Sequence, residues 1–355
     1  MAISLIQHSR ALTSKVVGSF VEEIKVKSGF NGWFPRETTP TLEVDVEVQR
    51  DNDLIAVDVV RFTEGNKNKF SRVTEHKYIP PFFNEQHDFQ RDQVYMNSIA
   101  MGAGMDNVSI NAAIVKSAVK AIRKNRQKIE RAIAKQQADV LQTGIVTMVN
   151  GDNIDYRRKA ASMTVSPLPW SNPTTAKPLD DLRAGLEFLR DTGNSGGSAV
   201  NVIMSGQSLA YFLAADQITK QGSNVVKQIE RINIVMPQFE GATGFAFHGQ
   251  VAAGDFVINL WTYAEKYTND AGQTVKYLVP TNVIMIPDDF EGKTVFGGLY
   301  TLNKINGIDM PQIVETDYLI RNYSDEKTVS STLELTSAPL VIPFTIDKIY
   351  TFKAY

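Results

Sequence analysis

The stretch from Asp106 to Thr143 constrains the fold of this chain more than any other, because it contains neither glycine nor proline. Asp106 or Asn107 can cap its amino end, and Gly144 follows at the position of a left-handed C-terminal cap. Its apolar residues recur at helical spacing: Val115, Ala118, Val119, Ile122, Ile129, Ile133, Val140 and Leu141. The pattern predicts one helix over about 106–143, roughly 50 Å long at about 1.5 Å per residue. Such a helix is expected to act as a long support in a chain that is otherwise rich in strands.

The polar positions of this helix are basic. Eight of them form what we call the basic face, with Glu130 as the one acid among them: Lys116, Lys120, Arg123, Lys124, Arg126, Lys128, Arg131 and Lys135. One interpretation is the solvated side of an ordinary surface helix. The other is a positive surface that meets carboxylates of another chain or phosphates of a nucleic acid. The sequence alone favours neither.

The overall charge of the chain gives no indication of a nucleic-acid partner. Lys plus Arg number 37 against 39 for Asp plus Glu, but the charge is segregated along the chain. Acids gather before the helix, at Glu43, Asp45, Glu47, Asp51, Asp53 and Asp58. Segregated charge on a nearly neutral chain suits self-association.

The chain has no cysteine, which excludes disulfides, thiolate metal sites and cysteine nucleophiles. Its first residues lack the pattern of a secretory leader, and no apolar run reaches the roughly 18 residues of a membrane span. We therefore expect a soluble protein that is neither exported nor embedded in a membrane.

The segment before residue 41 is rich in glycine and aromatic residues. Phe30, Trp33 and Phe34 lie where no local periodicity would bury them. They suggest an arm, residues 1–40, that docks on another molecule. The alternative is a segment packed on its own domain, and both interpretations stay open here.

Residues 41–80 predict a projecting β-hairpin. Apolar residues alternate over 42–48 and again over 54–59, on either side of a turn-forming cluster at 50–53. A polar, basic loop tip follows, and a second extended piece leads back over 73–80. The candidate residues for a contact with a neighbouring chain are Arg61, Lys67, Lys69, Phe70 and Arg72.

The rest of the chain divides into two kinds of pattern. Residues 178–310 alternate helices and strands, with helices at 180–190, 207–215 and 224–232 and a buried strand at 199–204. Residues from about 311 are strand-rich. Two short strands around 150–152 follow the long helix. The fold class is therefore α+β, with an α/β lobe.

Catalytic and metal-binding patterns are missing from the sequence. The four histidines, His8, His76, His87 and His248, have no metal-ligand spacing. Neither a nucleophile elbow nor a phosphate-binding loop occurs. The acidic cluster Asp288–Glu291 could hold a divalent cation, although an acidic turn is the commoner explanation. We expect no cofactor and no enzymatic activity.

Several stretches resemble one family of known proteins. The apolar strand and aromatic helix of 196–218, the strand–hairpin–strand run of 247–287, the strand TLELTSAPLVIP at 332–343 and the helix end at 130–148 are similar to the major capsid protein E family of lambdoid phages. The most specific points are Ser337–Leu340 and the turn at Asn269–Gly272. That family has the Hong Kong 97-type capsid fold.

The resemblance assigns roles to the parts. It implies an N-terminal arm (1–40), an extended hairpin loop (41–80), a peripheral domain (81–177 and 311–355) with the long helix as its spine, and an axial domain (178–310). It implies a virion shell of hexamers and pentamers around packaged double-stranded DNA, held by non-specific contacts and assembled in the cytoplasm of a bacterial host. The implied partners are a scaffold, a portal and a decoration protein.

Two alternatives remain. One is an encapsulin-type compartment, which shares the fold but encloses cargo enzymes. The other is an enzyme with its site in the α/β lobe, around Gly193–Gly197 and Asp288–Glu291.

Overall fold

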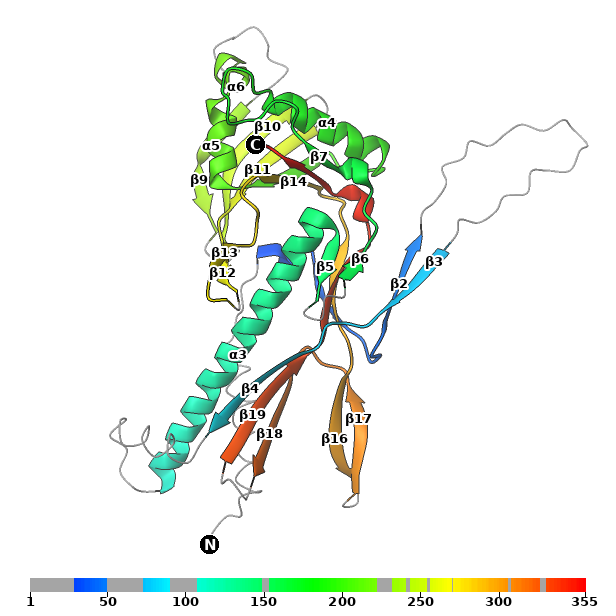
Figure 1. Cartoon of the computed structure of the whole chain (residues 1–355), viewed down its shortest axis with the longest axis vertical. Helices are drawn as coiled ribbons and strands as arrows, with labels where there is room; N and C mark the ends of the chain where they lie inside the picture. The colour runs from blue at the N-terminus through cyan, green and yellow to red at the C-terminus, as the bar shows by residue number, and fades with distance from the viewer. Residues whose placement is uncertain are drawn as a thin grey trace, which may run out of the picture.

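The computed structural model describes residues 29–49, 73–89, 107–148, 153–221, 232–240, 243–253, 256–269, 271–305, 308–325 and 330–355. An α/β lobe lies at one end, a long helix runs away from it, and β-hairpins project from the junction (Figure 1). The predictions for residues between these ranges, including the loop tip at 61–72, lie outside the described residues.

The predicted helix is confirmed as α3 (Asn107–Thr143). It ends as expected: Gly144 has a positive φ of 73°, and its N–H donates to the carbonyl of Val140 at 2.9 Å. A side chain there would also collide with Arg158, because a Cβ on Gly144 would lie 2.9 Å from Cβ of Arg158. Both the backbone conformation and the close packing therefore require glycine at this position.

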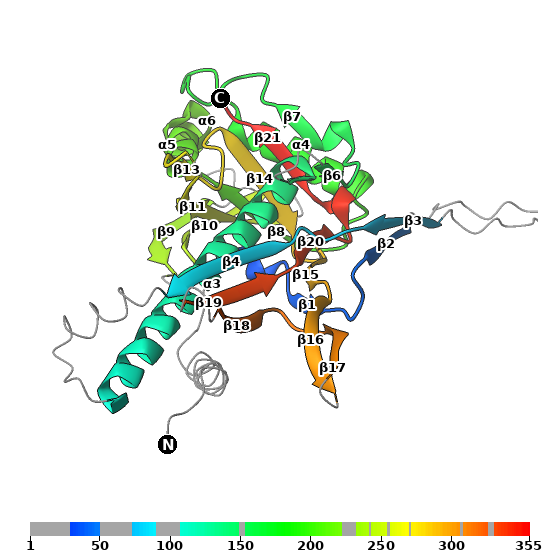
Figure 2. The ribbon, with the colours of Figure 1, turned by 60° about the horizontal axis from the view of Figure 1, so that its bottom comes forward.

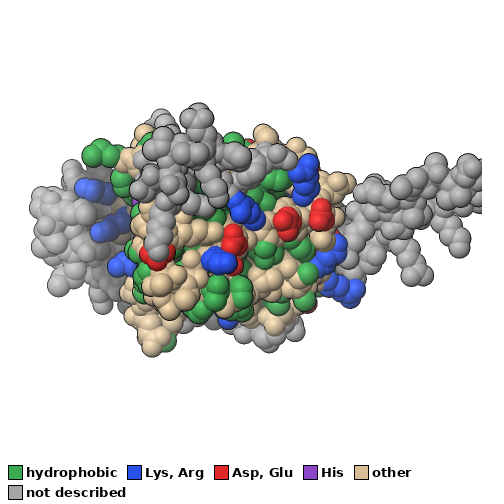
Figure 3. All heavy atoms as spheres, turned by 90° about the horizontal axis from the view of Figure 1, so that it is seen from above, with side chains coloured by type: hydrophobic (Ala, Val, Ile, Leu, Met, Phe, Trp, Pro, Cys, Tyr) green, Lys and Arg blue, Asp and Glu red, His purple; other side chains and the backbone are tan. Residues whose placement is uncertain are grey.

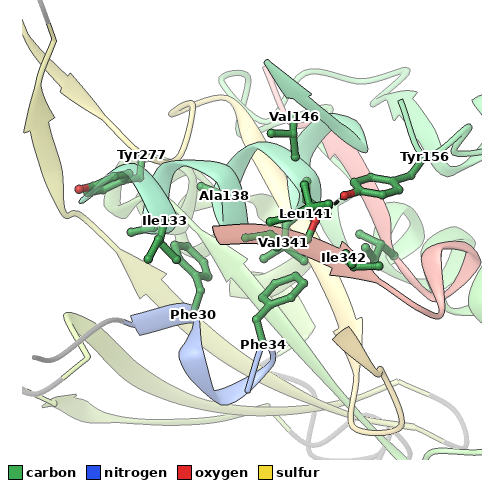
Figure 4. Packing of buried hydrophobic residues seen from close by; sticks show 14 of the residues in the cluster. Phe30, Phe34, Ile133, Ala138, Leu141, Val146, Tyr156, Tyr277, Val341 and Ile342 are labelled. Atoms are coloured by element: carbon green, nitrogen blue, oxygen red, sulfur yellow. Dashed lines mark hydrogen bonds between the residues drawn. The ribbon is translucent and has the colours of Figure 1, made fainter. Parts of the chain in front are cut away.

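The carboxyl half of α3 is buried in the main core of the chain. Ile133, Ala138 and Leu141 pack against Val341 and Ile342 of β20 (Pro339–Pro343) (Figure 4). The two-stranded antiparallel sheet of β5 (Ile145–Thr147) and β6 (Asn153–Asp155) follows directly, where the sequence predicted two short strands.

The α/β lobe is built on a seven-stranded mixed sheet. In spatial order its strands are β7 (Met163–Val165), β21 (Tyr350–Lys353), β14 (Asn282–Pro287), β8 (Ala199–Met204), β11 (Phe256–Tyr263), β10 (Phe245–Ala253) and β9 (Ile232–Phe239). The helices α4 (Pro178–Asp191), α5 (Gly206–Ala214) and α6 (Asp216–Gln221) belong to this lobe (Figure 1). A second core fills it, centred on Trp170, Leu182 and Phe212.

Two strands of this sheet come from segments that the sequence assigned to the other domain. β7 lies before residue 178 and β21 after residue 311, yet they pair with each other, and β21 pairs with β14. An extended pattern predicts a strand but carries no information on its partner. The α/β lobe therefore draws on more of the chain than the predicted boundaries 178–310.

Two three-stranded sheets lie beside α3. One has the order β1 (Arg36–Thr38), β15 (Gly292–Phe296) and β20. The other has the order β18 (Leu319–Asp325), β19 (Ser330–Ser337) and β4 (Phe83–Phe89), and Leu333 of β19 packs on Ala118 and Ile122 of the helix. In both views of the ribbon β4 and β19 run beside the helix (Figures 1 and 2).

Three further hairpins complete the fold. They are β2 (Val44–Gln49) with β3 (Val73–Tyr78), β12 (Lys266–Thr268) with β13 (Thr274–Lys276), and β16 (Leu299–Ile305) with β17 (Ile308–Val314). Short 3-10 turns are η1 (Gly29–Gly32), η2 (Ala160–Ser162) and η3 (Ile346–Lys348). The sequence predicted the turn between β12 and β13, where Gly272 has a φ of 76°.

Two predictions lie largely outside the described residues. β2 pairs with β3, so the described arms of the projecting hairpin are 44–49 and 73–78; the predicted return strand 54–59 lies outside the described residues. The predicted helix 224–232 also lies outside them, except for Ile232, which begins the strand β9.

Candidate functional site

The basic face is largely a solvent-exposed stripe along α3. Six residues of the basic face are exposed: Lys116, Lys120, Arg123, Lys124, Lys128 and Arg131. The opposite side of the helix is buried. Lys128 pairs with Glu85 of β4 at 2.6 Å, and half-buried Lys135 pairs with Asp139 at 2.6 Å. Arg126 does not belong to this stripe, because it turns toward Glu130 and Tyr318. What the structure offers is a row of cations suited to an extended anionic partner.

Glu130, the one acid of the basic face, is buried at a crossing of three segments. It accepts hydrogen bonds from Arg36 Nη2 of β1 at 2.5 Å and from the hydroxyl of Tyr318 at 2.6 Å. Arg126 Nε lies 3.6 Å from Oε1 of Glu130, the oxygen that also accepts from Tyr318, and the Arg126 guanidinium lies 4.7 Å from the ring centroid of Tyr318. Burial and the charge of Glu130 raise the pKa of Tyr318, so its hydroxyl stays protonated and donates. This cluster links α3 to β1, which precedes it in the sequence, and to Tyr318, which follows it.

Arg158 is the second buried charge, and it lies at the carboxyl end of α3. Its guanidinium donates to the carbonyls of Leu141 and Gln142, at 3.0 and 3.3 Å, and to the carbonyl of Ile349 at 2.9 Å. It also bonds to Ser162 and Thr351. Burial lowers the pKa of Arg158 to about 9, so the group is still protonated at neutral pH. A cation here satisfies carbonyls that the helix leaves unpaired and complements its dipole.

Two buried glutamines join α3 to the strands around it. The amide of Gln142 donates to the carbonyl of Tyr277 at 2.9 Å and accepts from the N–H of Val279 at 2.9 Å. That of Gln137 donates to the hydroxyl of Thr294 at 3.1 Å. The helix is therefore fixed along its carboxyl half by polar contacts as well as by apolar packing.

The three aromatic residues proposed as a docking arm pack on this chain itself. Phe30 and Phe34 are fully buried, and Trp33 packs against the same core (Figure 4). Phe30 meets Phe245 and Tyr263 of the α/β lobe, with ring centroids 5.4 and 4.7 Å apart. The structure thus matches the second of the two alternatives for these residues. The arm's other residues, 1–28, lie outside the described ranges.

The acidic turn Asp288–Glu291 joins neighbouring segments of the chain through hydrogen bonds. Asp289 accepts hydrogen bonds from Lys348 Nζ at 2.7 Å, from Ser195 Oγ at 2.8 Å and from the N–H of Gly196 at 3.1 Å. Burial opposes ionisation, but these bonds outweigh it and hold the pKa of Asp289 below its usual value. Asp288 accepts from Asn201 at 2.7 Å. The carboxylates of Asp288 and Asp289 therefore bond to side chains and backbone of this chain.

The described histidines also have ordinary surroundings. His87 is exposed, and His248 Nε2 lies 2.8 Å from the hydroxyl of Thr262. Within the described ranges, His, Asp and Glu side chains form no group of three suited to a metal ion. In the same part of the chain, no helix combines the length and the apolar character that crossing a bilayer demands. Seen from above, the α/β lobe presents acidic, basic and apolar side chains intermixed (Figure 3).

Sequence reasoning found the basic face but missed the functions of Glu130, Arg158 and the two glutamines in the fold. A signal existed for Glu130, since a lone acid among eight cations on one helix is unusual. Arg158 lies in a polar loop and carried no such signal.

Comparison with solved structures shows the same fold elsewhere. A protein described as the capsid protein of a prophage of Escherichia coli CFT073 superposes with a TM-score of 0.61 at 16% identity, over 100% of each chain. The cyanophage A-1(L) capsid gives 0.48 at 10% identity over 94% of each chain. The encapsulin of Synechococcus elongatus gives 0.43 at 10% identity, over 100% of this chain and 96% of that one.

The Hong Kong 97-like capsid fold expected from the sequence is thereby confirmed. No protein with a curated description matches this sequence. The sequence does match a family model described as phage major capsid protein E, over residues 26–354, which is nearly the whole chain. The chain therefore belongs to the phage major capsid protein E family.

Proposed function

We propose that this chain is the shell subunit of a phage head, forming hexamers and pentamers around double-stranded DNA. The observation that carries the proposal is the family match over residues 26–354. A long helix fixed at its carboxyl end by Arg158 and the buried glutamines supports it, because a shell subunit has to transmit load between its contacts. The same family match is why the encapsulin and enzyme alternatives are not proposed.

The parts of the subunit would then act as follows. The β2–β3 hairpin, which projects away from the rest of the chain (Figure 1), would place residues 50–72 on a neighbouring subunit. α3 and the sheets beside it would form the peripheral domain, and the α/β lobe the axial domain. A scaffold, a portal and a decoration protein would join assembly in the host cytoplasm, before the finished virion leaves.

Negative-stain microscopy and light scattering of the protein, produced alone and with the products of its neighbouring genes, test the function. We expect closed particles, sheets or rings. Deleting 65–70 is expected to leave a folded subunit that no longer closes particles, because the deleted loop would bridge subunits. A monodisperse monomer in every condition contradicts the function; normal particles from the deletion variant contradict only the proposed loop contact.

We also propose that the exposed part of the basic face contacts phosphates of packaged DNA without sequence preference. The triple variant Lys116→Gln, Lys120→Gln and Lys124→Gln is expected to weaken double-stranded DNA binding by the unassembled subunit. Each lost phosphate contact should reduce the slope of log affinity against log salt by about 0.9. The unfolding free energy of the triple variant should stay within about 0.5 kcal/mol of the wild-type value, since all three residues are exposed.

A matched control places the same three changes elsewhere on the surface. Lys266 and Lys276 are exposed on the β12–β13 hairpin, and Lys353 is exposed on β21. Their triple glutamine variant removes equal charge and should retain the wild-type salt slope. Equal losses in both variants would show that net charge alone acts. Unchanged binding with defective particle formation in the α3 variant would assign the basic face to carboxylates of neighbouring subunits.

A further inference from the structure

The β16–β17 hairpin presents an uncovered apolar face. Its register places Tyr300 opposite Ile313 and Leu302 opposite Pro311, and alternate residues of a strand share a face. Tyr300 is 56% exposed, Leu302 67% and Ile313 41%, and Pro311 is exposed as well. We call these four residues the hairpin face. The opposite side carries Thr301, Gln312 and Met310.

The hairpin face is held in a fixed position at its base. Leu299 at the start of β16 is buried, and the backbone beside it is tightly packed. A Cβ on Gly298 would lie 2.6 Å from Cγ2 of Ile313 and 2.8 Å from the carbonyl oxygen of Pro40. The sheet has only two strands, and such a sheet is marginally stable without further packing. A fixed, exposed apolar face of this kind is typical of an interaction site.

The chemistry of the hairpin narrows the choice of partner. Between Leu299 and Val314 the sequence carries one lysine and one aspartate, so its net charge is zero. A nucleic acid is a poor fit, since its binding depends on cations. Because the hairpin has no net charge, it can pack against a second copy of this chain without like-charge repulsion. In Figure 1 the hairpin points away from the α/β lobe, where another subunit can reach it.

Pro311 indicates which part of the hairpin, its strand edge or its side chains, is available to a partner. A proline has no N–H, so Pro311 cannot form the hydrogen-bonded pair with Leu302; its backbone must therefore face the outer edge of β17. That edge lacks a donor at its centre, which disfavours addition of another strand. The side chains of the hairpin face, rather than the strand edge, are left to make the contact.

We propose that the hairpin face docks on a second copy of this chain in the assembled shell, an inference that rests on the proposed function. Leu302→Glu places a carboxylate in the centre of that face. Because an unpaired charge is costly to bury, the yield of closed particles should fall by about tenfold or more. The circular dichroism spectrum and Tm of the unassembled subunit should not change, because Leu302 is mostly exposed.

Gln312→Glu is the matched control, since it adds the same charge to the opposite side of the same hairpin. It should assemble as the wild type does. Normal assembly of Leu302→Glu overturns the inference and leaves the proposed function intact. Failure of the wild-type protein to assemble in any condition overturns the proposed function itself, and the docking inference with it.

A second measurement identifies the partner independently of folding effects. The chain has no cysteine, so Leu302→Cys provides one attachment point for a benzophenone maleimide. After irradiation of assembled particles, we expect a product of twice the chain mass of 39.4 kDa. A product joined to any other protein, or no product at all, overturns the assignment of a second copy as the partner.

Discussion

Arg158→Met is expected to lower the unfolding free energy of the unassembled subunit by about 3–5 kcal/mol, the largest single-residue effect that this structure predicts. Methionine preserves much of the volume but removes every donor. The carbonyls of Gln142 and Ile349 then lose the donor that Arg158 supplies, and the carbonyl of Leu141 keeps only the hydroxyl of Thr351. Each such loss costs about 1–3 kcal/mol, and the helix end loses a stabilising cation as well. Denaturant unfolding followed by circular dichroism measures the change.

The neighbouring residue supplies the control. Arg157 is exposed, and Arg157→Met removes an identical group one position away, so it should change stability by no more than about 0.5 kcal/mol. Arg158→Lys should recover only part of the loss, because an ammonium cannot reproduce the fork of a guanidinium that reaches several acceptors. Equal stabilities of the Arg157 and Arg158 variants would refute the assignment of Arg158 as the cap of α3.

The long helix was predictable because every local signal agreed. Helical apolar spacing, the absence of glycine and proline, and Gly144 at the end all point to the same element, and α3 has the expected extent. The strand 199–204 was predictable for a similar reason, since β8 is a short continuous apolar run bounded by turns. Elements of this kind depend on their own residues more than on their neighbours.

Strand partners were not predictable, because alternation specifies a strand and a face but not the strand beside it. β21 lies at the carboxyl end of the chain and pairs with β7 and β14 in the α/β lobe, although the sequence placed its segment in the other domain. Likewise β2 pairs with β3, across 23 residues that include the strand expected to be its partner. Only tertiary packing selects among such pairings.

The candidate site was predictable only in part. The basic face could be identified from composition and spacing, but Arg126 left it because a buried acid and an aromatic ring lie beside it. Apart from Trp33, the aromatic partners of Phe30 and Phe34 come from β10, β11 and the turn after β14, more than 200 residues away. Burial by such remote segments is invisible to periodicity.

Glu130→Gln is expected to lower the unfolding free energy by about 2–3 kcal/mol. The amide keeps the shape of the side chain and can still accept from Tyr318, but it leaves the guanidinium groups of Arg36 and Arg126 with the more distant Asp317, 3.9 Å from Arg36, as a counter-charge. Breaking a fully buried ion pair costs about 3–5 kcal/mol. Both arginine side chains keep about a fifth of their exposure, 23% and 17%, so solvent screening reduces the figure here.

Glu85→Gln is the matched control, because Glu85 also pairs with a cation of α3 but in solvent. The Lys128–Glu85 bridge is 48% and 31% exposed, and its loss should cost less than about 1 kcal/mol. In a double-mutant cycle, Arg36→Met and Glu130→Gln should show a coupling of about 1 kcal/mol or more, since the two residues are in contact. Additive effects, or equal losses from the Glu85 and Glu130 variants, would mean that the cluster does not hold β1 on the helix. The segment 29–38 would then be anchored by its aromatic residues and by the pairing of β1 with β15.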